Sequence, residues 1–121
     1  MDLNILFVGI GGAVGAILRY LISLLPVKSG FPVLTLLTNI IGAFVIGLVV
    51  ALAVKHNLPD NLVLFLKTGV CGGFTTFSTF SLEAYNLING GKIGMGIAYA
   101  ALSLVLCIAA VFLGQTIVGR Q

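Results

Sequence analysis

The stretch from Gly69 to Ser81 gathers the residues of this chain that are best suited to contacting an ion. It combines paired glycines, five hydroxyl-bearing side chains and three phenylalanines: Gly72, Gly73, Thr75, Thr76, Ser78, Thr79, Ser81, Phe74, Phe77 and Phe80. Hydroxyls can donate and accept hydrogen bonds, and the edge of a phenylalanine ring carries partial positive charge. Glycine tolerates backbone angles that other residues avoid. We therefore interpret residues 70–80 as a break in a helix, where carbonyls and ring edges face an ion.

The composition around this stretch is that of an integral membrane protein. Of the 121 residues, 60% are hydrophobic and only 7% are charged, and the mean hydropathy is +1.23. A soluble domain carries roughly a quarter charged residues. A membrane-spanning helix takes about 20 apolar residues, so the length allows four spans with short loops. Non-helical backbone at membrane depth must be buried in protein or line a water-filled path.

The apolar runs predict an all-α membrane protein in which one domain, residues 1–121, contains four transmembrane helices. The third helix is expected to break at mid-membrane, and Asp60 or Asn61 is expected to cap its start. The first apolar run has the length of a span and no basic segment precedes it, so we expect no cleavable signal peptide. The predicted spans are Leu3–Leu25, Val33–Val54, Leu62–Ile88 and Ile93–Val118.

Several classes of function find no support in the sequence. Cys71 and Cys107 both lie in apolar segments, and the single histidine, His56, lies in a loop. No Cys/His cluster therefore has metal-ligand spacing, and no Ser/His/Asp set suits nucleophilic catalysis. The net charge of +3 is scattered along the chain, unlike the basic patch of a nucleic-acid-binding protein. We expect neither an enzyme nor a nucleic-acid partner.

Small and polar residues follow helical spacing in three of the spans. Gly11 and Gly15 form a GxxxG face that allows close helix packing. In the second span, Asn39 lies on a polar face; it could bond a neighbouring helix or donate to an ion, and the interhelical bond is favoured on physical grounds alone. The fourth span carries a polar side chain every fourth residue: Tyr99, Ser103 and Cys107.

Two charged residues within the spans have open interpretations. Arg19 could extend to the membrane interface, or it could face an aqueous vestibule that attracts anions. Glu83 is the only carboxylate within a span and lies just past the break. We expect it to bond the broken backbone or Arg19 rather than to relay protons.

The positive charges are balanced between the two sides of the membrane. Each side holds three: Lys55, Lys67 and Arg120 on one, and Arg19, Lys28 and Lys92 on the other. The positive-inside rule then assigns no preferred orientation. Because such a chain can insert both ways, an antiparallel homodimer with its two-fold axis in the membrane plane is a natural hypothesis.

The chain resembles the Fluc (CrcB) family of fluoride channels over nearly its whole length. The most specific part of the resemblance is the run Gly72–Ser81 in a four-span chain this short. The residues that carry it are Gly11-Gly12 and Leu18-Arg19-Tyr20 in the first span, Thr35, Thr38, Asn39 and Gly42 in the second, Thr68–Gly73 and Phe80–Glu83 beside the break, and Tyr99 and Ser103 in the fourth.

The resemblance implies a dual-topology homodimer in the bacterial inner membrane, with two parallel fluoride pores that are each lined by both subunits. It implies passive export of cytoplasmic fluoride, which limits fluoride toxicity. Phe77 and Phe80 match the family's pore phenylalanines, whose ring edges face the anion. The polar track of the family is matched by Asn39, Ser78, Thr79, Tyr99 and Ser103.

The resemblance also implies a cofactor. The backbone carbonyls of Gly72 and Thr75 match those that hold a structural sodium ion at the two-fold axis. Cys107 stands where the family often has a serine, and a thiol is a weaker donor than a hydroxyl. We therefore expect Cys107 to contribute little to anion transit.

Two other functions were weighed against a channel. A small multidrug transporter also has four antiparallel spans, but it needs a membrane-embedded carboxylate in span one to exchange protons for cationic drugs. Span one here contains Arg19 and no acid. An assembly subunit without transport would explain Gly11 and Gly15, but not the hydroxyl-rich and Phe-rich break.

Overall fold

The computed structural model describes residues 3–119, and this part of the chain is helical apart from short connections. Four helical stretches are long and apolar enough to cross a membrane: Asn4–Ser23, Val33–His56, Asp60–Asn89 and Ile93–Val118. The prediction of four spans is confirmed. In chain order the elements are α1 (Asn4–Ser23), α2 (Val33–His56), α3 (Asp60–Val63), η1 (Leu64–Cys71), α4 (Gly72–Phe74), α5 (Phe77–Asn89) and α6 (Ile93–Val118).

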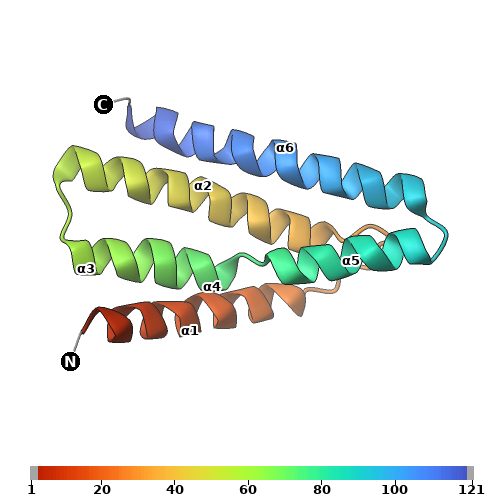
Figure 1. The fold of residues 1–121 in the computed structure, drawn as a ribbon, viewed down its shortest axis with the longest axis horizontal. Helices are drawn as coiled ribbons and strands as arrows, with labels where there is room; N and C mark the ends of the chain where they lie inside the picture. The colour runs from red at the N-terminus through yellow and green to blue at the C-terminus, as the bar shows by residue number, and fades with distance from the viewer. Residues whose placement is uncertain (1–2, 120–121) are drawn as a thin grey trace.

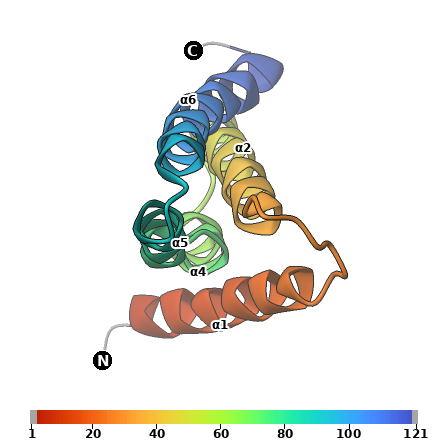
Figure 2. The same cartoon turned by 90° about the vertical axis from the view of Figure 1, so that its right-hand side faces the viewer.

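The third span lies between α1 and the pair formed by α2 and α6. Figure 1 shows α2 and α6 side by side, with the segments α3 to α5 running in the opposite direction next to them. Figure 2 shows α1 on the opposite side of α4 and α5 from α6. The broken span is therefore flanked by α1 on one side and by α2 and α6 on the other.

Glycine allows α1 to approach the third span closely. A Cβ atom on the buried Gly11 would lie 2.5 Å from the carbonyl oxygen of Phe65 and 2.9 Å from the Cα of Gly69. Gly15 is also buried, and a Cβ there would lie 2.7 Å from the backbone nitrogen of Phe74. The close packing expected of the GxxxG face is confirmed.

The break itself is narrower than the sequence suggested. Only Thr75 (φ −86°, ψ 157°) and Thr76 (φ −148°, ψ 117°) are extended, angles that β-branched residues adopt readily. Gly72 and Gly73 belong to helix α4, so the prediction that they release the chain from the helix is wrong. Gly73 serves packing instead, because a Cβ there would lie 3.0 Å from the Cα of Gly12.

The start of the third span also differs from the prediction. Pro59 occupies the N-cap position without a side-chain cap bond, and Asp60 is already the first helical residue. The expected capping by Asp60 or Asn61 is therefore wrong. Residues 64–71 then form a π-helix, a rare conformation that occurs mostly as short stretches, frequently at functional sites.

Candidate functional site

The side chain of Asn39 on α2 hydrogen-bonds the backbone at the break. Its Nδ2 donates to the Thr76 carbonyl oxygen at 3.1 Å, and its Oδ1 accepts from the Thr76 amide at 2.8 Å. The amide side chain thus pairs with an extended residue as a neighbouring β-strand would. An interhelical role for Asn39 is shown. Because an amide nitrogen carries two hydrogens, one N–H is left for another acceptor.

Threonine hydroxyls close the two helix ends that flank the break. The Thr75 hydroxyl donates to the Cys71 carbonyl oxygen at 2.9 Å. On the other side, the Thr76 Oγ1 accepts from the Thr79 amide at 3.0 Å and caps α5. The Ser78 hydroxyl lies 3.4 Å from the same Thr76 oxygen. These bonds satisfy groups that water cannot reach in a membrane.

The same bonds leave two backbone carbonyls without their helical partners. In a continuous helix, the Gly72 carbonyl would accept a hydrogen bond from the Thr76 amide, and the Thr75 carbonyl would accept one from the Thr79 amide. Those amides bond Asn39 and the Thr76 hydroxyl instead. Within residues 3–119, neither carbonyl receives a hydrogen bond. Free carbonyl oxygens suit hard cations, so the two residues fit the sodium site that the resemblance implies.

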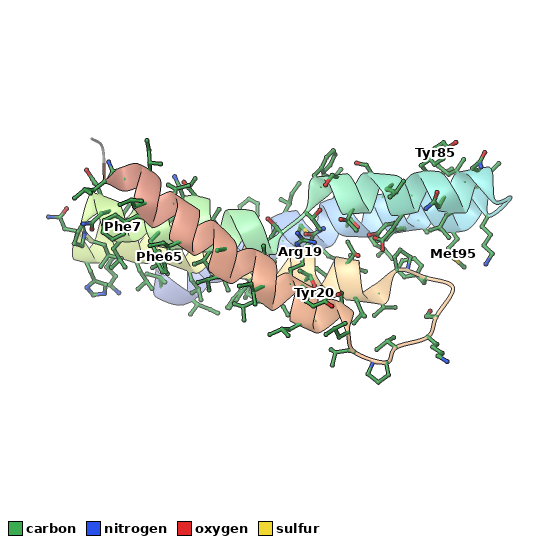
Figure 3. The ribbon with its side chains drawn as sticks, turned by 90° about the horizontal axis from the view of Figure 1, so that it is seen from below. Phe7, Arg19, Tyr20, Phe65, Tyr85 and Met95 are labelled. Carbon is green, nitrogen blue, oxygen red and sulfur yellow. The ribbon has the colours of Figure 1, made fainter. Side chains whose placement is uncertain are left out.

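Arg19 bonds the backbone at the break. Its Nε donates to the Gly73 carbonyl oxygen at 3.3 Å, and in Figure 3 its side chain lies beside the connection between α4 and α5. In a continuous helix this carbonyl would accept from Phe77, the first residue of α5. One donor of the Arg19 guanidinium is therefore bound to the broken backbone.

Glu83 binds α6 rather than the partners expected from the sequence. Its Oε1 accepts from the hydroxyl of Tyr99 at 3.0 Å, and Tyr99 is fully buried. The expected bond to Arg19 or to the broken backbone is wrong, because Glu83 lies almost two turns along α5 and its side chain reaches α6. The bond joins the second half of the broken span to its neighbour.

Four aromatic rings from three parts of the chain lie in series. The ring centroids of Phe77 and Phe80 are 5.5 Å apart, and those of Phe80 and Tyr99 are 5.0 Å apart. Phe31 meets Tyr99 edge-on at 5.4 Å. At the other end of the series, Phe77 is 80% exposed. The sequence did not indicate a role for Phe31, which lies in the loop before α2.

A cavity of about 560 Å³ opens beside the break, between α2, the third span and α6. Ser103 is one of its lining residues, and the hydroxyl of this residue is buried and has no hydrogen-bond partner in the part of the chain described. Of the predicted site residues, the cavity brings together Asn39, Gly72, Thr75, Phe77, Phe80 and Ser103. Those outside its lining are Ser78, Thr79, Tyr99, Arg19 and Glu83.

A family model described as "CrcB-like protein, Camphor Resistance (CrcB)" matches residues 6–115. The chain belongs to the CrcB family. It is 52% identical over 118 residues to "Fluoride-specific ion channel FluC" of Ruminiclostridium cellulolyticum, covering 93% of this chain and 90% of that protein. A protein of the same name from Agrobacterium fabrum is 47% identical over 123 residues and 98% of both chains. One from Methanocaldococcus jannaschii is 40% identical over 115 residues, 94% of this chain and 93% of its own.

The family assignment confirms the resemblance that the residues around the break suggested. One charged residue lines the cavity of this CrcB protein, and the sequence analysis gave it no role in the site. Lys67 lines the cavity, although the sequence placed it only near the start of a helix. A single lysine inside an apolar span was the signal that could have identified it.

Proposed function

We propose that this protein is a fluoride channel that exports fluoride from the bacterial cytoplasm by passive conduction across the inner membrane. The observation that carries the proposal is the cavity beside the break. Ser103, whose buried hydroxyl has no hydrogen-bond partner among the described residues, lines this cavity together with Phe77 and Phe80. Its relatives are named fluoride-specific ion channels. Fluoride that enters cells as the neutral acid would leave down its gradient, which lowers its toxicity.

The lining of the cavity suits a small anion. Most of its lining residues are apolar, Asn39, Ser103 and Lys67 are among the others, and no Asp or Glu lies among its described lining residues. Donors replace the water that an anion loses, and the positively polarised edges of the phenylalanine rings attract it. Conduction requires binding that admits the ion and still releases it. We assign Ser78, Thr79 and Tyr99 to the same track on the basis of the resemblance.

We further propose an antiparallel homodimer with two pores, each lined by both subunits. Phe77 is 80% exposed in the single chain although it belongs to the aromatic series, and a second copy would cover it. The balance of three positive charges on each side supports insertion in both orientations. A two-fold axis in the membrane plane then relates the two broken helices.

A structural sodium ion at that axis completes the proposal. The free carbonyls of Gly72 and Thr75 would hold it. When bound, the ion supplies positive charge that offsets the negative ends of these carbonyl dipoles. The carbonyl of the neighbouring Gly73 is a third such dipole. Arg19 donates to it, so its negative end is offset without an ion.

Fluoride efflux from proteoliposomes tests the function. Liposomes loaded with potassium fluoride should release fluoride quickly once valinomycin allows potassium to follow, because a passive channel moves charge. A strict requirement for a proton gradient, or for exchange against a cationic drug, would contradict the channel. A multidrug transporter already lacks support, since the Glu83 carboxylate bonds Tyr99 and lies outside the cavity lining.

A further inference from the structure

Phe31 is fixed in an otherwise exposed loop by hydrogen bonds on both sides of its backbone. Its amide donates to the hydroxyl oxygen of Ser29 at 3.1 Å, and its carbonyl oxygen accepts from the Val33 amide at 2.8 Å. Pro32 lies inside the second bond with φ −76° and ψ 70°, the angles of an inverse γ-turn, and its ring holds that φ. The position of Phe31 is therefore set by its own neighbours in the chain.

The ring of Phe31 is packed against Tyr99 of α6. The two rings meet edge-on, with centroids 5.4 Å apart and planes at 82°. Gly30 and Pro32, the chain neighbours of Phe31, line a recess of about 240 Å³, and Phe31 is not among the described residues of that lining. Its ring therefore points away from the recess and helps to cover Tyr99, which is fully buried.

The hydrogen bond from Tyr99 to Glu83 fixes only one end of the tyrosine ring. It joins the phenol oxygen to Oε1 at 3.0 Å, and the phenol oxygen lies on the axis about which the ring turns. Because the last torsion of a tyrosine side chain is broad, this bond alone does not set the plane of the ring. The plane is set by the neighbouring rings of Phe80, at 5.0 Å, and Phe31, at 5.4 Å.

We propose that Phe31 is a positioning residue for fluoride conduction, which acts by fixing the ring plane of Tyr99. Phe80 packs on the same tyrosine ring, and Phe77 continues the series. Because an aromatic ring has a negative face and a positive edge, the plane of Tyr99 decides which of the two meets Phe80. The inference rests on the proposed function and adds to it a residue that lies outside the cavity lining.

Ring flips of Tyr99 give a readout that does not require conduction. The chain has three tyrosines, and Tyr20 and Tyr85 are exposed. Replacing these two by phenylalanine leaves Tyr99 as the only NMR signal of isotopically labelled tyrosine. Phe31→Ala should raise the flip rate by about tenfold, the factor expected from the loss of one aromatic pair. Phe31→Tyr, which keeps a ring, and Val27→Ala, at an exposed position of the same loop, should leave the rate unchanged.

Fluoride efflux from proteoliposomes then tests whether the ring plane matters for conduction. Per folded protein, Phe31→Ala should lower the initial rate by up to about tenfold, whereas Phe31→Tyr and Val27→Ala should conduct like the unaltered protein. Phe31→Leu keeps apolar bulk without a ring edge. It should change the flip rate and the flux in the same direction as Phe31→Ala but by less, so the test does not depend on the folding of the alanine variant.

The two readouts separate the positioning role from the proposed function. An unchanged Tyr99 flip rate in folded Phe31→Ala and Phe31→Leu would overturn the role, and so would faster flips combined with the flux of Val27→Ala. If the unaltered protein conducts no fluoride, the channel proposal fails, and the flip rate still decides whether Phe31 fixes the ring of Tyr99.

Discussion

The Asn39 side chain bonds both the amide and the carbonyl of Thr76, at 2.8 and 3.1 Å. One residue of α2 thereby holds the third span open at its most irregular point. The diverted Thr76 amide is also the reason why the Gly72 carbonyl has no helical partner. The shape of the break and the free state of the Gly72 carbonyl therefore both depend on Asn39.

Asn39→Ala should destabilise the protein and abolish most of its fluoride flux. The substitution leaves the amide and carbonyl of Thr76 without partners, at a cost of roughly 1–3 kcal/mol for each buried group. Thermal unfolding in detergent, together with fluoride efflux, measures both effects. Asn86→Ala, which truncates an exposed asparagine on α5, is the control. An Asn39→Ala protein that is as stable and active as this control would contradict the role of the pair.

Phe80→Leu should reduce fluoride flux while the protein still folds. Leucine retains most of the apolar contacts but removes the positively polarised ring edge. We expect a loss of about tenfold, equivalent to ~1.4 kcal/mol in the barrier, measured as initial efflux from proteoliposomes. Phe112→Leu, on an exposed face of α6, should conduct normally. Equal flux from both variants would mean that Phe80 only packs against Tyr99.

Much of this architecture could be predicted from the sequence. Hydropathy located the four spans, and hydroxyls beside glycines located the break. The role predicted for the glycines was wrong. Position 73 needs a glycine because the backbone there packs against Gly12 of another helix, and sequence spacing does not show that contact. The partners of Arg19 and Glu83 were also missed. A side chain within a span can reach several helices, and which one it reaches depends on rotations set by packing.

Adding lysines to the loop at residues 26–32 should bias insertion and lower activity. Two or three extra charges on one side give the chain a preferred orientation, so antiparallel partners become scarce. Reporter fusions at the C-terminus should show both orientations for the unaltered protein and one for the variant. Adding the same number of lysines to residues 55–61 should restore the mixture and the flux. A single orientation in the unaltered protein would refute the dual topology.

Prolonged removal of sodium should weaken the protein. Without a cation, the Gly72 and Thr75 carbonyls of two antiparallel copies would face one another unsatisfied. Replacing sodium on both sides by N-methylglucamine should slowly reduce fluoride flux or dissociate the dimer, and returning sodium should restore them. Constant flux and dimer content throughout the exchange would count against the ion.

The most direct test of the central claim is the reversal potential of currents through the purified protein in a planar bilayer. With a tenfold gradient of fluoride and a constant concentration of chloride, a passive fluoride channel should reverse at the Nernst potential of fluoride. The potential should not move when pH differs across the membrane at fixed fluoride concentrations. A reversal potential that follows chloride or the proton gradient, or the absence of any current, would contradict the assignment.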